Sequence, residues 1–202
     1  MTCVERLEEY EEKLIKEHGA PSERVVTVSG LVGVGSSTVA DILSDELGFE
    51  HVSSGKFFRR KAEEKDMELT EFFDNHRSPE GGPDPDLMWD RRALNLAYTK
   101  NDLILEGRMT GPLLCDIAEV RVLVRCDEKV AAERLAKRED LDPRKALKVL
   151  RKRNSQDIKT YRQKYGIDVK DEKYYNVVVD NSGSLEETRK DLLEKVRDRM
   201  DD

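Results

Sequence analysis

The stretch from residue 30 to residue 38 combines three glycines with three hydroxyl side chains, in the order Gly30-Leu31-Val32-Gly33-Val34-Gly35-Ser36-Ser37-Thr38. It follows a β-branched run over 25–28 and leads into a helical pattern over 39–47. A strand, a glycine-rich turn and a helix N-terminus in this order present backbone N–H groups and a positive dipole end to one point, which suits the phosphates of a nucleotide. The stretch matches G-x-x-x-x-G-K-[ST] except that Ser36 replaces the lysine. We therefore predict a phosphate-binding loop that lacks its usual cation.

Two hydroxyl groups of this loop are candidates for direct ligand contacts. The Ser37 hydroxyl would ligate Mg²⁺, and Thr38 would lie near the α-phosphate. The competing interpretation is a plain strand-to-helix turn, with Ser37 and Thr38 as ordinary first-turn helix residues. We favour phosphate binding because the strand, the glycine spacing, Ser37 and the helix all agree with it.

Two arginines follow predicted strands elsewhere in the chain and could bind a second phosphate. Arg59 closes a block that contains Ser54 and Gly55, and Arg108 closes the segment Leu-Glu-Gly-Arg. Open α/β folds bind ligands at the carboxyl edge of the sheet, where strands of this kind end. Two guanidinium groups that converge there would form a bidentate clamp for an oxyanion. Either arginine alone could be a surface charge, but their joint placement favours a substrate phosphate.

The composition bounds the class of protein. A chain of 202 residues can bury one good core, and its net charge of −7 argues against a broad nucleic-acid surface, although basic residues gather between 129 and 162 and suggest a local anion site. Cys3, Cys115 and Cys126 are widely spaced, as in reduced cytosolic thiols, and the histidines share no metal-ligand spacing with them. Membrane-length apolar runs and a signal-peptide pattern are absent from the sequence, so we expect a cytoplasmic protein with no membrane or nucleic-acid partner.

Strand and helix patterns alternate along the chain, which predicts a parallel sheet covered on both faces. The strands are expected at 25–28, 49–52, 103–105, 120–124 and 176–179. Helices are expected at 4–18, 39–47, 55–65, 69–77, 86–100, 127–139 and 143–165 and from Ser184 onward, with a loop over 78–85. The first helix has Val4, Leu7, Leu14 and Ile15 toward one face and would pack on the domain or on a second subunit.

From Val25 to Ser182 the chain resembles the nucleoside-monophosphate kinases, and most closely the archaeal type of cytidylate kinase. The matching segments occur in order and are 29–38, 51–55 with Arg59, Asp86 with 90–92, 105–108, 132–139 and 165–168. The most specific of them are Leu-Glu-Gly-Arg at 105–108 and Tyr-Gly-Ile-Asp at 165–168.

The resemblance implies an α/β P-loop kinase fold of three layers, with a five-stranded parallel sheet and helices on both faces. It places a helical monophosphate-binding insert near 55–100 and a short lid around 138–165, within a domain over 24–202 that follows a helical extension over 1–23. It also implies an ATP- and Mg²⁺-dependent transfer of phosphate to CMP or dCMP by a monomer or weak dimer. Other acceptors such as AMP, and a nucleotide-binding regulatory protein without turnover, are the alternatives.

Site residues follow from the same resemblance. Arg59 and Arg108 would hold the acceptor phosphate beside Ser54 and Gly55. Lid arginines would close over the donor, and these are Arg134, Arg138 and Arg153; each could instead lie on a solvated helix face. Asp90 and Arg91 could read the base or ribose, and Trp89 would be core or a gate to the acceptor pocket. One departure from the family is Thr160, which stands where relatives tend to have an arginine.

Overall fold

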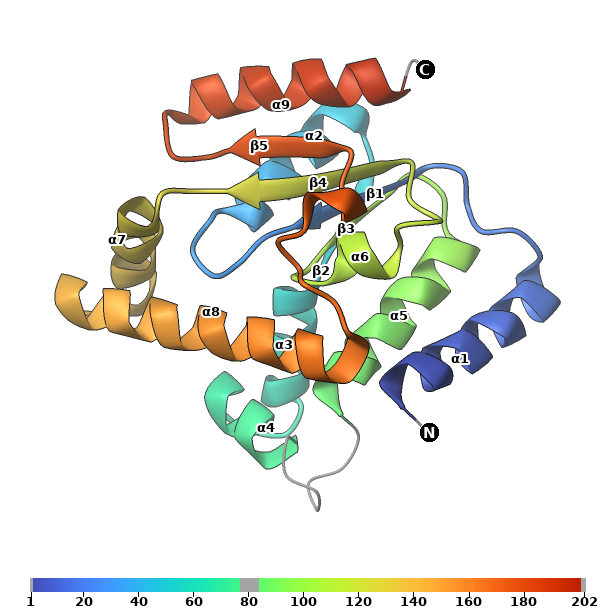
Figure 1. Cartoon of the computed structure of the whole chain (residues 1–202), viewed down its shortest axis with the longest axis horizontal. Coiled ribbons are helices and arrows are strands. Elements are labelled where there is room, and N and C mark those ends of the chain that lie inside the picture. Colours follow the sequence, from blue (N-terminus) through green and yellow to red (C-terminus); the bar gives the residue numbers. More distant parts are fainter. Residues whose placement is uncertain (1, 77–83, 201–202) are drawn as a thin grey trace.

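Five parallel strands form one sheet at the centre of the molecule in the computed structural model, which describes residues 2–76 and 84–200 (Figure 1). In the spatial order β2-β3-β1-β4-β5 they span Glu50–Ser53 (β2), Leu103–Glu106 (β3), Val25–Ser29 (β1), Val120–Arg125 (β4) and Val177–Asp180 (β5). The central strand β1 is buried along its whole length, and its Thr27 lies between Leu105 of β3 and Arg121 of β4. Continuous buried β-branched runs are typical of parallel strands covered on both faces. The predicted α/β fold with five parallel strands is confirmed.

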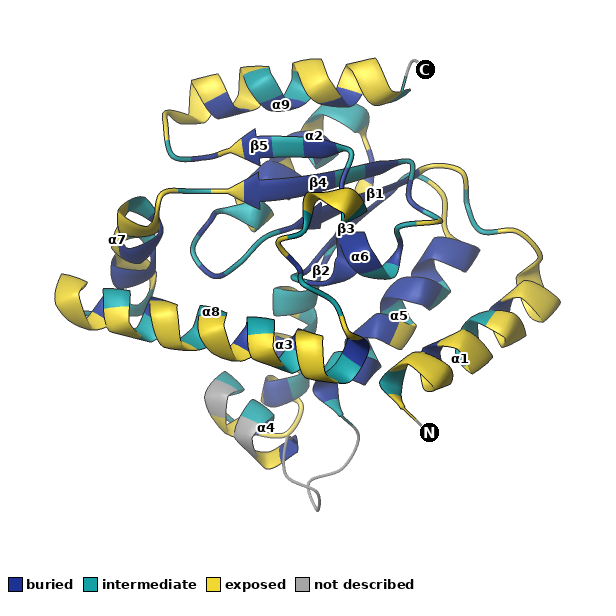
Figure 2. Cartoon of the chain, viewed as in Figure 1, coloured by how far each residue is buried: buried dark blue, intermediate teal, exposed yellow. Residues whose placement is uncertain are grey.

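Helices cover both faces of this sheet (Figure 1). On one face α2 (Ser36–Leu47) and α9 (Leu185–Met200) pack on the valines of β1, β4 and β5. On the other face α5 (Pro85–Thr99) and α6 (Thr110–Leu113) share a core with residues of α1 (Cys3–His18) and α8 (Pro143–Tyr165). The remaining elements are α3 (Ser54–Glu63), α4 (Leu69–His76), α7 (Glu128–Glu139) and the 3₁₀ turn η1 (Glu172–Tyr174). Figure 2 shows the buried central strands against the exposed outer faces of α1, α8 and α9.

The N-terminal helix α1 packs on α5 and α8 of its own chain. Leu7 and Leu14 are buried in this contact, and the Tyr98 hydroxyl of α5 donates to Glu11 at 2.9 Å. Val4 and Ile15, which the sequence also placed on the apolar face, are 37% and 50% exposed. The apolar stripe of α1 is therefore narrower than predicted.

Most predicted element bounds agree with the structure to within two residues, and the differences have local causes. The last strand begins after Asn176 because that side chain binds backbone groups of Arg121 and Glu119. The predicted loop over 78–85 lies outside the described residues except for Asp84 and Pro85, which instead cap and begin α5. Within the described residues, none of the helices has the length and apolar character needed to cross a membrane.

Candidate active site

The predicted phosphate-binding loop connects β1 to α2 at the carboxyl edge of the sheet (Figure 1). Gly33 and Gly35 adopt positive φ angles of 83° and 86°, a region that favours glycine. A Cβ at Gly35 would lie 2.3 Å from Nδ2 of Asn181, so the loop also needs glycine for space. Gly35 is the N-cap of α2 and, among the described residues, no side chain caps this helix. Its first-turn N–H groups are thus open to an anion, with Ser37 and Thr38 exposed beside them.

Side chains from three other segments hold this loop in place. The Val34 carbonyl accepts from Nδ2 of Asn181 at 2.8 Å and from Arg134 at 3.4 Å. The Val32 N–H donates to Oδ1 of Asn154 in α8 at 3.0 Å. Arg134, predicted as a lid arginine, therefore touches the loop itself. Asn181 and Asn154 were not predicted, although Asn181 directly follows a strand at the same sheet edge, which is the signal that singled out Arg59 and Arg108.

A buried carboxylate joins the loop to the neighbouring helix α3. Glu106, at the end of β3, is 7% exposed and accepts from the Ser36 hydroxyl at 2.7 Å and from the Ser53 hydroxyl at 2.5 Å. Ser36 begins α2 and Ser53 is the N-cap of α3, so this one side chain ties together the starts of both helices. In the sequence, Ser36 was notable only because it replaces the usual lysine of the loop. In the structure, its hydroxyl donates to the Glu106 carboxylate.

The two predicted clamp arginines lie in different surroundings. The Arg59 guanidinium lies over Gly55, 3.5 Å from the position a Cβ would take there, and within the described residues it makes no ion pair. Nε of Arg108 is 2.8 Å from Asp157 of α8. Burial alone would lower the pKa of Arg108, but the Asp157 carboxylate and the nearby acidic groups of Tyr161, Glu106 and Asp86 together outweigh burial and raise the pKa. Arg108 is therefore held as a cation against α8.

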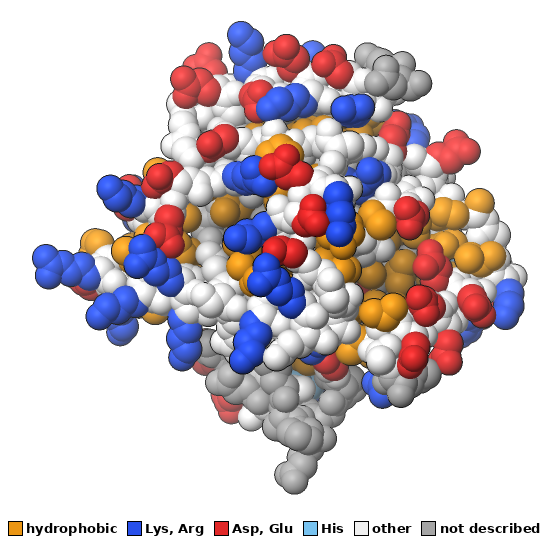
Figure 3. Space-filling view, viewed as in Figure 1, with side chains coloured by type: hydrophobic (Ala, Val, Ile, Leu, Met, Phe, Trp, Pro, Cys, Tyr) orange, Lys and Arg blue, Asp and Glu red, His pale blue; other side chains and the backbone are white. Residues whose placement is uncertain are grey.

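The other two arginines predicted for the lid, Arg138 and Arg153, share one carboxylate. Arg138 and Arg153 approach the same oxygen of Glu139, at 3.0 and 2.7 Å. Burial would raise the pKa of Glu139, but these two ion pairs outweigh it and lower the pKa. Lys and Arg side chains gather over α7 and α8 at the left of Figure 3. Arg138 of α7 and Arg153 of α8 thus lie together, and each is paired with Glu139.

Asp90 and Arg91, which were predicted to read the base or ribose, each contact a neighbouring helix. Asp90 is 2% exposed, and its carboxylate accepts from the Tyr165 hydroxyl at 2.6 Å. Burial raises the pKa of Asp90 to about 8, although the hydrogen bond from Tyr165 by itself lowers that pKa. The Arg91 guanidinium lies over the ring of Tyr10 in α1, 5.4 Å from its centroid. Asp90 is therefore enclosed between α5 and α8, and Arg91 joins α5 to α1.

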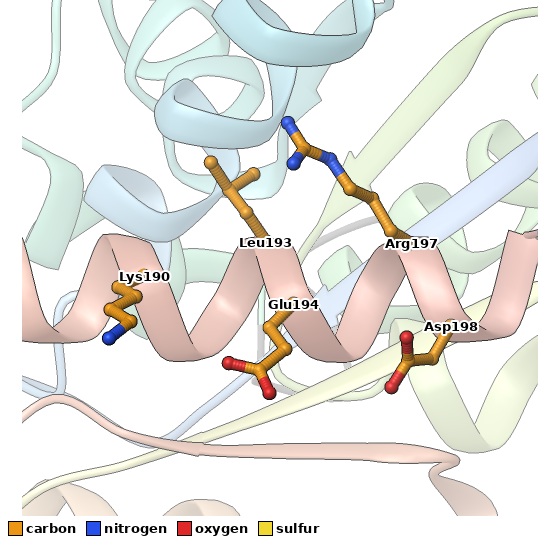
Figure 4. A pocket seen from close by; sticks show the side chains of 5 residues that line it. All are labelled: Lys190, Leu193, Glu194, Arg197 and Asp198. Carbon is orange, nitrogen blue, oxygen red and sulfur yellow. The ribbon is translucent and has the colours of Figure 1, made fainter.

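Two pockets differ in their relation to this site. One of about 480 Å³ lies along the loop, the end of β4 and the segment after α8, and is lined by Gly30, Leu31, Val34, Arg108, Leu123, Val124, Arg125, Cys126, Val169 and Lys170. The other, of about 390 Å³, is lined by Lys190, Leu193, Glu194, Arg197 and Asp198 (Figure 4). All five of the latter residues lie on α9, so only the first pocket adjoins the phosphate-binding loop.

Comparison with known proteins agrees with this geometry. The model of the cytidylate kinase-like family matches residues 25–183. The chain belongs to this family. It is 36% identical to the cytidylate kinase of Methanopyrus kandleri over 188 residues, which cover 87% of this chain and 94% of that protein. It is also 36% identical to the cytidylate kinase of Methanothermobacter thermautotrophicus over 158 residues, covering 78% of this chain and 95% of the relative.

Two solved structures share the fold of this chain. Shikimate kinase from Bacteroides thetaiotaomicron aligns with a TM-score of 0.60 at 10% identity, covering 88% of this chain and 98% of that one. An uncharacterized protein from Eubacterium ventriosum aligns with a TM-score of 0.64 at 15% identity, covering 87% and 98%. At these identities the likeness is one of fold.

Proposed function

We propose that this protein transfers the γ-phosphoryl group of ATP to CMP or dCMP, giving ADP and the nucleoside diphosphate. The observation that carries the proposal is the Glu106 carboxylate, which binds Ser36 of the phosphate-binding loop and Ser53 at the start of α3. An anion site for a donor and a candidate clamp for an acceptor therefore adjoin one another at one edge of the sheet. The match to the cytidylate kinase-like family and the two archaeal relatives support CMP as the acceptor.

The phosphate-binding loop would hold ATP through its backbone N–H groups, Gly30 to Thr38, and through the positive end of α2. Mg²⁺ in kinase sites is held by one or two protein oxygens together with substrate phosphates. The exposed Ser37 hydroxyl and the Glu106 carboxylate are oxygens of this kind at the start of α2. Ser37 and Glu106 would therefore hold Mg²⁺, which when bound neutralises charge on the phosphates.

Arg59 and Arg108 would hold the acceptor phosphate beside Ser54 and Gly55. No general base is needed, because the attacking oxygen already belongs to a phosphate anion. Phosphoryl transfer depends mainly on positioning and on neutralising the charge of the moving group. That charge would be met by the lid arginines, which are Arg134, Arg138 and Arg153.

We further propose that α3 to α5 form the acceptor-binding insert and that α7 and α8 form the lid. The protein would act on small molecules in the cytoplasm as a monomer or weak dimer. It would need neither a nucleic acid nor a membrane. The net charge of −7 supports the absence of a nucleic-acid partner.

The test is a panel of acceptors. ADP formation from ATP and Mg²⁺ is measured with CMP, dCMP, UMP, AMP and GMP at equal concentration. We expect CMP and dCMP to give the highest rates. A preference for AMP would assign a different acceptor to the same fold. Nucleotide binding without turnover in any arm would instead indicate a regulatory protein.

A further inference from the structure

The indole of Trp89 carries a buried hydrogen-bond donor that none of the described residues accepts from. Trp89 lies on α5 and is 4% exposed. Its Nε1 is buried and has no hydrogen-bond partner among the described residues. A buried indole N–H usually finds an acceptor, because leaving it unpaired costs the hydrogen bond that it would make with water. An unpaired donor in such a position therefore calls for an explanation.

The Trp89 donor lies against the residues that we assign to the acceptor site. A Cβ on Gly107 would be 3.1 Å from Nε1 of Trp89 and 3.1 Å from the Ser54 hydroxyl. Gly107 directly precedes Arg108, and Ser54 begins α3. Any side chain at position 107 would fill the space where the indole and the hydroxyl meet. The donor thus lies between two segments that each contribute a residue to the candidate clamp.

A second unpaired donor lies one helical turn further along α5. Nε of Arg92 is buried and, like Nε1 of Trp89, has no partner within the described residues. The Arg92 guanidinium lies 5.4 Å from the centroid of the Phe57 ring, and the Trp89 ring lies 5.7 Å from the same centroid. Residues three apart on a helix share one face. The Phe57 ring of α3 is therefore flanked by two donors that find no acceptor in the part of the chain that the structure describes.

We propose that Trp89 is a specificity-determining residue, whose indole N–H donates to an oxygen of the nucleoside part of the acceptor. This inference rests on the proposed function. The oxygen is a ribose hydroxyl or the pyrimidine carbonyl, because Arg59 and Arg108 already meet the charge of the phosphate. The Phe57 ring and the indole would supply the apolar wall against which the nucleoside packs.

The decisive variant is Trp89→Phe, which keeps an aromatic ring and removes the N–H. We expect the KM for CMP to rise about 5- to 50-fold, as for a lost hydrogen bond in a buried site. The KM for ATP and the melting temperature should change little. The matched control is Tyr98→Phe, which removes the polar group of another buried aromatic on α5 that is bonded to Glu11. A loss confined to CMP assigns the 2′-hydroxyl, and an equal loss with CMP and dCMP assigns one of the oxygens that both share, the base carbonyl or the 3′-hydroxyl.

A second measurement serves if Trp89→Phe does not fold. Trp89 is the single tryptophan of the chain, so the fluorescence of the wild-type protein reports on this position. CMP alone should change the emission saturably, and ATP alone should not. An unchanged KM for CMP in a folded variant, or an emission that CMP leaves unchanged, would overturn the assignment. A wild-type protein that does not phosphorylate CMP would overturn the proposed function, and this assignment with it.

Discussion

At the scale of single residues, Arg108 is the most informative side chain of the candidate acceptor site. Asp157 approaches its Nε at 2.8 Å, so the ion pair does not engage the terminal nitrogens through that contact. If the terminal nitrogens of Arg108 bind the acceptor phosphate, Arg108→Ala should cost about 1.5–3 kcal/mol of transition-state stabilisation, or about 10- to 150-fold in kcat/KM for CMP. Arg108→Lys should restore only part of it, because lysine lacks the bidentate fork. Steady-state kinetics with varied CMP measures both effects.

The control for Arg108 is Arg24→Ala. Arg24 precedes β1 and also forms one ion pair, with Asp102 at 2.9 Å, but it stands at the opposite end of the strand from the phosphate-binding loop. Its loss should leave kcat/KM close to the wild-type value. Kinetics of Arg108→Ala as good as those of Arg24→Ala would show that Arg108 is only a surface charge.

At the scale of the element, the proposed lid contains two arginines that share the Glu139 carboxylate. Charge on the transferred group is greatest in the transition state, so these arginines should act there more than on ATP in the ground state. We expect Arg138→Ala and Arg153→Ala each to lower kcat about 10- to 100-fold, with an ATP dissociation constant within about threefold of the wild type. Steady-state kinetics beside an ATP titration separates the two quantities.

Lys152→Ala provides the comparison on the same helix, since Lys152 is exposed and lies next to Arg153. Its kcat should match that of the wild type. Full kcat in both arginine variants would mean that Arg138 and Arg153 only form ion pairs with Glu139 and take no part in catalysis. The absence of a lysine at position 36 would then count in favour of nucleotide binding without turnover.

At the scale of the whole molecule, Asp90 couples stability to pH. Burial raises its pKa from the ordinary value of 3.8 to about 8 in the folded protein. The folded state therefore keeps a proton that the unfolded chain loses. The contribution of this group to stability is full below about pH 4 and is lost as pH rises through about 8. Asp90→Asn removes the titration, so it should raise the melting temperature more at pH 9 than at pH 5.5.

The control for this titration is Asp191→Asn. The Asp191 side chain is 44% exposed and pairs with Lys195 at 2.8 Å one turn along α9. It should shift the melting temperature by a similar small amount at both pH values. Thermal melts of the three proteins at both pH values test the prediction, which fails if Asp90→Asn gives the same shift at each.

Local interactions explain what the sequence by itself determined. The glycine-rich loop between a β-branched strand and a helix was recognisable because its geometry depends on neighbouring residues. The same holds for Asp142, which accepts from the N–H of Arg144 at the start of α8, and for the capping pair of Ser184 and Glu187. Alternation of strands and helices then indicated the parallel sheet.

Tertiary structure alone decided which distant side chains meet. Ser36 and Glu106 are 70 residues apart and touch because β3 lies next to β1 in the sheet. Asn181 and Val34 are 147 residues apart, and their contact depends on where the end of β5 lies relative to the loop. The sequence does not distinguish Asp90 from a solvent-exposed aspartate, whereas in the fold it is buried and accepts from the Tyr165 hydroxyl of α8. Such contacts depend on strand order and helix packing, which the spacing of residues along one chain does not contain.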